Sequence, residues 1–189
     1  MELTTGDVSF TFRLNEAGQR HVAPIDLIEW EPFRSTNTVP GREGQHVLLE
    51  CAMIFDEREE EERLADRHTY LPALEYFLKH RVAITDAVMA ASVKFAQDLY
   101  KVSVKYGVDR VELAQVATID DLKTMIDLSY VQLFPYHQNG LPYIGHRFES
   151  NWDEYGFYAL LLGTEVLACG YSGTALAIDR SIRDDGGEI

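Results

Sequence analysis

The sequence predicts an α+β fold, in which antiparallel β-sheet packs against one long helix and the chain ends in a β-meander. Strand-like patterns occupy its first and last thirds, and a helical pattern occupies the middle. A length of 189 residues is usual for a single domain. We therefore expect one domain over residues 1–178, made of N-terminal strands (1–55), helices (72–126) and a meander (128–170), followed by a flexible acidic tail (179–189).

Three segments of the first third are typical of strands. Residues 8–12 alternate apolar with polar side chains, residues 45–55 are rich in strand-forming types, and residues 25–31 resemble a third strand. Proline and glycine within residues 38–44 indicate a turn, so the last two strands could pair as neighbours. We expect a small antiparallel sheet here.

A run of acidic residues follows these strands. Residues 56–67 show no apolar periodicity, which indicates a solvated loop or a short exposed helix. They also lack the Asp/Asn and Gly spacing of a calcium loop. A basic protein could dock on this acidic patch, which consists of Asp56, Glu57, Glu59, Glu60, Glu61 and Glu62.

The helical region supplies the expected core. Apolar residues recur there at spacings of three and four and share one face, namely Ile84, Val88, Ala91, Phe95, Leu99 and Val102. The pattern changes near Thr85, which could cap a new helix. We therefore expect two helices, at residues 72–80 and 83–105, with Gly107 ending the second. Further on, Thr118 and Asp121 resemble a capping box that begins a short helix.

Turn signals in the last third predict two hairpins. Asn139-Gly140 is a typical hairpin dipeptide, and Gly163-Thr164 joins the next two strands. The expected strands of this meander lie at residues 128–135, 141–148, 155–162 and 165–170.

The net charge limits the partners. With 31 acidic and 17 basic residues the chain carries −14, a charge that repels nucleic acid and anionic lipid and attracts basic proteins. The first residues lack the pattern of a signal peptide, and no apolar run is long enough to span a membrane. We expect a cytoplasmic protein that binds neither nucleic acid nor membrane. The acidic charge fits two interpretations, of which the first is the simpler: it keeps the protein soluble, or it attracts a basic protein partner.

The chain shows no pattern that indicates catalysis. Its six histidines lack metal-ligand spacing, and it contains no phosphate-binding glycine loop and no nucleophile elbow. We therefore expect no metal, no cofactor and no catalytic residue. Cys51 and Cys169, each within an apolar run, are expected to be buried free thiols.

The most distinctive stretch, residues 143–161, combines an aromatic-rich hairpin with a Trp-Asp-Glu tip. Two interpretations stay open for it. Trp152 could brace the hairpin against the helix while Asp153 caps the turn, or the stretch could bind a partner or ligand. The candidate binding residues are Trp152, Asp153, Glu154, Tyr155, Tyr143 and His146.

This stretch resembles a bacterial family of unknown function. Its hairpin reads roughly Tyr-x-Gly-x-x-Phe, then Trp-Asp-Glu-Glu-His-Gly, then two apolar strands. The chain supplies Tyr143-Ile144-Gly145, Phe148, Trp152-Asp153-Glu154 and Gly156, with Tyr155 alone in place of Glu-His. The resemblance covers residues 118–173. Members look like candidate immunity proteins of polymorphic toxin systems, which implies binding rather than catalysis.

Two functional hypotheses follow. The first is a non-enzymatic acidic binding protein, a candidate immunity protein that neutralises a basic toxin domain. The alternative is a small-ligand-binding protein or enzyme whose site lies between the helix and the aromatic hairpin.

Overall fold

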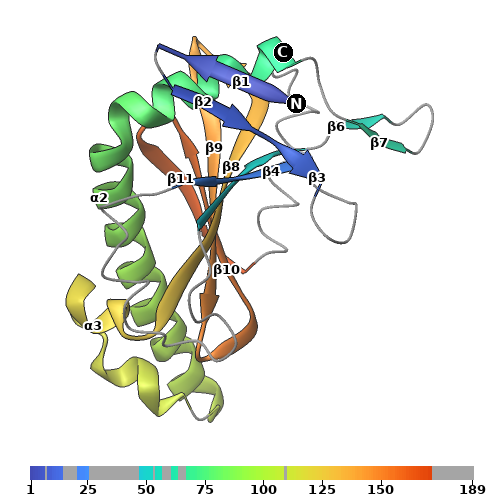
Figure 1. Ribbon diagram of the computed structural model, residues 1–189. Helices are drawn as coiled ribbons and strands as arrows, with labels where there is room; N and C mark the ends of the chain where they lie inside the picture. Colours follow the sequence, from blue (N-terminus) through green and yellow to red (C-terminus); the bar gives the residue numbers. More distant parts are fainter. Residues whose placement is uncertain are drawn as a thin grey trace.

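A seven-stranded β-sheet with one long helix on its face forms the body of the protein (Figure 1). The helix, α2 (Arg67–Tyr106), contacts the C-terminal strands of the sheet and the N-terminal strand β1 (Glu2–Thr5). This arrangement confirms the predicted α+β class. The computed structural model describes residues 1–6, 8–14, 21–25, 47–52, 54–56, 61–63, 67–108 and 110–171.

The strand order of the large sheet is β11-β10-β9-β8-β5-β4-β3. Its strands are β3 (Arg13–Leu14), β4 (His21–Ile25), β5 (Val47–Cys51), β8 (Ile126–Gln138), β9 (Leu141–Ser150), β10 (Asp153–Leu162) and β11 (Glu165–Gly170). The meander β8 to β11 is antiparallel, as predicted. However, β5 and β8 pair in parallel, because the chain between them crosses over through α2 instead of turning back in a hairpin.

The N-terminal strands differ from the prediction. Strand β2 (Val8–Thr11) confirms the segment predicted at 8–12, but it pairs with β1 in a separate two-stranded sheet. Strand β4 covers residues 21–25 and thus includes only the first residue of the strand expected at 25–31, because residues 26–46 lie outside the described part of the chain. Strand β4 does pair with β5 in the antiparallel sense.

The strand predicted at 45–55 is two strands in different sheets. After β5, strand β6 (Ile54–Asp56) pairs with β7 (Glu61–Arg63) in a short hairpin. Asp56 and residues 61–63 are therefore in strands and not in the loop or helix expected for residues 56–67, whereas residues 57–60 and 64–66 lie outside the described part of the chain. Strand pairing satisfies the backbone of this charged segment although its residue types do not favour strands.

Helix α2 is continuous, so the predicted break near Thr85 is wrong. Phe77, Ile84 and Val88 are almost fully buried at helical spacings of seven and four. Thr85 is itself buried inside the helix, where it caps nothing. The buried stripe runs past the expected break, and packing of this stripe against the sheet outweighs the local capping signal. No helix in the described ranges has the length and apolarity needed to cross a bilayer.

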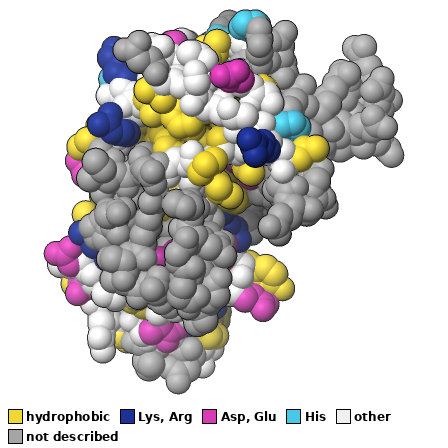
Figure 2. Space-filling model, viewed as in Figure 1, with side chains coloured by type: hydrophobic (Ala, Val, Ile, Leu, Met, Phe, Trp, Pro, Cys, Tyr) yellow, Lys and Arg dark blue, Asp and Glu magenta, His cyan; other side chains and the backbone are white. Residues whose placement is uncertain are grey.

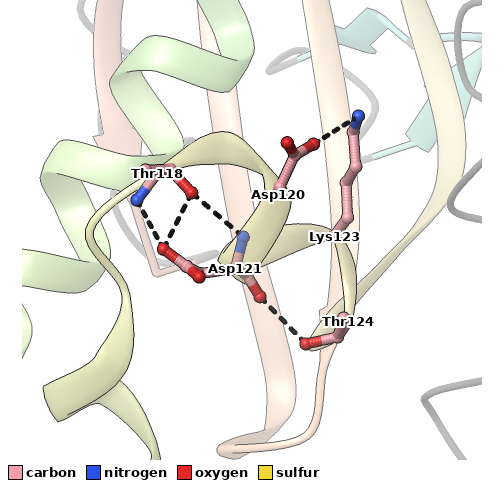
Figure 3. Close-up of polar contacts among 5 residues, drawn as sticks. All are labelled: Thr118, Asp120, Asp121, Lys123 and Thr124. Carbon is pink, nitrogen blue, oxygen red and sulfur yellow. Dashed lines mark hydrogen bonds and ion pairs between the residues drawn. The ribbon is translucent and has the colours of Figure 1, made fainter.

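The short helix α3 (Ile119–Lys123) begins with the predicted capping box (Figure 3). The Thr118 hydroxyl accepts a hydrogen bond from the Asp121 amide at 3.3 Å, and the Asp121 carboxylate accepts one from the Thr118 amide at 2.8 Å. Hydrogen bonding from Thr118 lowers the pKa of Asp121. A 3-10 helix, η2 (Val111–Gln115), connects α2 to this element.

Both faces of the sheet carry buried apolar residues. The main core fills the space between α2 and the sheet and includes Phe157, Ala159 and Leu161 of β10. The alternate residues Tyr158 and Leu160 belong to a second cluster, as expected for side chains that alternate along a strand. Its buried members are Ala52, Phe134, Tyr136, Tyr143, Tyr158 and Leu160.

Candidate functional site

The corner between β9 and β10, residues 150–157, contains an irregularity in the strand pairing. Asp153 pairs with Ser150 and Phe157 pairs with Phe148, so four residue steps on β10 oppose two on β9. Gly156 absorbs this bulge with a φ of 58°. A Cβ at this position would lie 2.0 Å from the Phe148 carbonyl oxygen. The glycine of the Trp-Asp-Glu-Tyr-Gly sequence is therefore required by the backbone.

Trp152 lies in the core below this corner. Its side chain is 7% exposed, and its ring stacks on Phe157 with centroids 5.8 Å apart. Phe157 in turn stacks on Phe148 at 4.7 Å. The indole Nε1–H has no hydrogen-bond acceptor among the residues described. This geometry supports the interpretation in which Trp152 braces the hairpin.

Two arginines hold the backbone of the corner. Arg110 donates a hydrogen bond to the Trp152 carbonyl oxygen, and its guanidinium lies 3.7 Å from the Asp153 carboxylate. Both charged groups of this ion pair are largely buried. The other Asp153 oxygen accepts the Tyr155 amide at 2.9 Å, and Arg147 donates to the Tyr155 carbonyl oxygen. Asp153 therefore orders the turn, as one of the two sequence interpretations expected.

The outer side of the corner is exposed. Glu154 faces solvent, and the Tyr155 side chain is 66% exposed although its own amide and carbonyl are both bonded. An aromatic side chain on a fixed backbone loses little conformational entropy when a partner covers it. Among the six candidate binding residues of the hairpin, Glu154 and Tyr155 are exposed, and we call them the corner tip.

Tyr143 and His146 are not part of this corner. Tyr143 belongs to the second cluster, where its hydroxyl donates to Gln138 at 2.9 Å. His146 is fully buried in the main core beside the Phe77 ring. Burial lowers the pKa of His146 to about 3, so its imidazole is neutral near pH 7. The six predicted residues thus separate into four at the corner and two elsewhere.

The Tyr-x-Gly part of the hairpin sequence also has a structural reason. The Tyr158 side chain lies across Gly145, where a Cβ would come within 1.5 Å of the Tyr158 hydroxyl. Because this space is free, Tyr158 donates to the Gln132 amide oxygen at 2.5 Å. The Gln132 amide nitrogen then donates to the buried carboxylate of Glu50 at 2.7 Å. Gly145 makes this polar chain possible.

The predicted acidic patch is described only in part. Asp56 and Glu61 are direct partners in the β6–β7 register, and Glu62 lies opposite Phe55. The other predicted members, Glu57, Glu59 and Glu60, lie outside the described residues. The hairpin therefore sets at least two acidic positions opposite each other.

The cysteines are free thiols, as predicted. Cys51 is buried and Cys169 is partly buried, and burial raises the pKa of each thiol to about 12. Within the described ranges, no three His, Cys, Asp or Glu side chains are grouped so that they could hold a metal ion.

No sequence signal pointed to Arg110 and Arg147, the two arginines that hold the backbone of the corner. Arg110 lies 42 residues from Trp152, outside every motif, and its contact arises only when η2 packs beside the corner. Arg147 lies within the aromatic stretch but carried no pattern of its own.

Comparison with known protein families gives a match over most of the chain. The model of a family described as Domain of unknown function (DUF6985) matches residues 29–176. No curated protein and no solved structure matches the chain.

Proposed function

We propose that this chain, which belongs to the family described as Domain of unknown function (DUF6985), is a non-enzymatic binding protein that presents its corner tip to a basic partner. One observation carries the proposal. Tyr155 is 66% exposed, yet the backbone around it is fixed by Asp153 and Arg147. Tyrosines in such positions are frequent anchors of protein interfaces.

Charge supports a basic partner. The chain carries −14, so its field attracts cationic proteins and speeds their encounter. Glu154 adds a carboxylate directly beside the aromatic anchor. The acidic positions of the β6–β7 hairpin would add to the long-range attraction.

A finer proposal concerns the biological role. We infer a bacterial immunity protein that acts in the cytoplasm and neutralises a basic toxin domain. Its support is the resemblance of the hairpin sequence to candidate immunity proteins, together with the acidic charge.

The alternative of a ligand or enzyme site at the aromatic hairpin has less support. In that alternative, one cavity would be lined by Tyr143, His146, Trp152, Asp153 and Tyr155. However, Trp152 and His146 are enclosed in the main core, and Tyr143 lies in the second cluster. Only Tyr155 of that set is freely exposed.

A capture experiment with paired charge reversals tests the proposal. The protein is immobilised and incubated with lysate of its source organism at low and high salt, and captured proteins are identified by mass spectrometry. Glu154→Lys is compared with Glu165→Lys, an exposed glutamate at the start of β11, at the other end of β10. We expect a basic protein that Glu154→Lys no longer captures, that Glu165→Lys still captures, and that high salt releases.

Equal capture by the two variants would show that any partner binds elsewhere on the surface. Absence of a salt-sensitive basic protein would argue against the charge-based part of the proposal.

A further inference from the structure

A cavity of about 410 Å³ lies between β2 and β4, far along the sheet from the corner tip. Its apolar walls come from Phe10, Val22, Ala23 and Pro24. In the region where Figure 1 places β2 and β4, Figure 2 shows a patch of hydrophobic side chains with basic side chains on two sides and an acidic side chain above it. We call the cavity between β2 and β4 the wedge cavity. Its volume is within the range of small-ligand sites.

The path of the chain creates this cavity. Strand β3 pairs with β4 through Arg13–Val22 and Leu14–His21. Just before β3 the chain leaves β4, because β2 pairs with β1 and not with the sheet. Buried Phe12 marks the bend, and its amide donates to the Met1 carbonyl oxygen at 2.7 Å. Strands β2 and β4 therefore diverge from a closed end at β3. The space between them follows from the strand pairing.

The polar groups of the wedge cavity indicate the sign of the charge on its ligand. Arg13 lies at the closed end, exposed, and it forms no ion pair with any residue that the structure describes. Ser9 and Thr11 add hydroxyl groups, and no carboxylate side chain lines the cavity among the described residues. An apolar surface beside a guanidinium that has no ion-pair partner among the described residues suits an apolar group that carries a carboxylate.

We infer that the wedge cavity binds the carboxylate of a small apolar molecule, with Arg13 holding the carboxylate and Phe10, Val22 and Pro24 contacting the apolar part. The same chemistry is present in a free aliphatic acid and in the C-terminal residue of a peptide. This site is separate from the proposed protein-binding corner and does not depend on it.

An NMR titration of the full chain tests the inference. Octanoate stands for a free acid and N-acetyl-leucine for a peptide C-terminus, while octanol and octylamine are the uncharged and cationic controls. We expect millimolar octanoate or N-acetyl-leucine to shift the amide signals of β2, Arg13 and β4. Arg13→Gln should weaken that binding by about fivefold, the effect of one exposed charged contact.

Two variants control the experiment. Arg81→Gln removes an exposed arginine on α2 outside the cavity and should leave acid binding unchanged. Thr11→Trp places a large ring at an exposed position of the wall and should block both acids. If the Thr11 variant does not fold, the comparison of the two arginine variants still decides.

Stronger binding of one acid identifies the source of the carboxylate. The inference is overturned if neither acid shifts signals in β2 and β4, if octylamine binds as well as octanoate, or if Arg13→Gln binds octanoate like the parent.

Discussion

Trp152 and Tyr155 are three residues apart in one corner, yet they face opposite environments. Trp152 is 7% exposed and stacked in the main core, whereas Tyr155 is 66% exposed on a backbone held by Asp153 and Arg147. The Trp-Asp-Glu-Tyr-Gly sequence does not distinguish these environments, because both aromatics belong to the same motif. The inner side of the corner is therefore part of the core, whereas the outer side stays accessible to solvent.

Replacing Trp152 gives the largest expected effect. Trp152→Ala removes a stacked aromatic from the core and should lower the free energy of unfolding by about 3–5 kcal/mol. Chemical denaturation measures this loss. Trp152→Phe should cost much less, since the indole N–H has no acceptor among the described residues and no hydrogen bond to them is lost. An unchanged unfolding midpoint for the alanine variant would contradict the core assignment.

Replacing Gly156 should have the second-largest effect on stability, and replacing Gly140 is its matched control. Both have positive φ, of 58° and 74°, so alanine strains the backbone at each. Only at Gly156 would the new Cβ also meet a backbone carbonyl; at Gly140 nothing lies within 4 Å. We expect Gly156→Ala to cost at least about 2 kcal/mol, clearly more than Gly140→Ala. If both variants lost the same stability in thermal unfolding, the Phe148 carbonyl would not restrict the side chain at position 156.

Like Trp152, His146 on β9 is buried in the main core, and its burial should make the free energy of unfolding depend on pH. Burial lowers its folded pKa to about 3, below the value of 6.5 for an unperturbed histidine. Between these values the unfolded chain binds a proton that the folded chain does not, so stability falls as pH drops below about 6.5. The slope is up to about 1.4 kcal/mol per pH unit.

Unfolding of His146→Leu across this pH range should show a flatter dependence than the parent. Parallel curves for the His146 variant and the parent would mean that His146 is not the titrating group.

Local signals explain how much of the meander the sequence predicted. Asn139 and Gly140 both adopt positive φ, as the hairpin dipeptide requires, and the strands on either side follow. In the N-terminal third the pairing depends on partners distant in sequence. The β5 segment pairs in parallel with β8, which is about 80 residues away, and no local pattern encodes that choice.

At the β9–β10 corner, too, local sequence signals predicted one part of the structure and contacts between distant residues decided the rest. The sequence singled out residues 152–155, because aromatic and acidic residues cluster there. It did not reveal which of them are exposed, because burial of Trp152 depends on Phe157 and the packing of the whole core. Arg110 could not be predicted, since its contact with the corner spans 42 residues of sequence.

A comparison of Tyr155→Ala with Tyr106→Ala tests whether the exposed side of the corner contributes to binding and not to folding. Tyr106 is a similarly exposed tyrosine at the end of α2, with 70% of its side chain accessible. For each variant the free energy of unfolding and the affinity for the captured basic partner are measured together. The account predicts that both variants unfold within about 0.5 kcal/mol of the parent. Only Tyr155→Ala should lose binding, by about 2 kcal/mol or more. A Tyr155→Ala protein that binds the partner like its parent, or that loses as much stability as Trp152→Ala, would contradict the division of the corner.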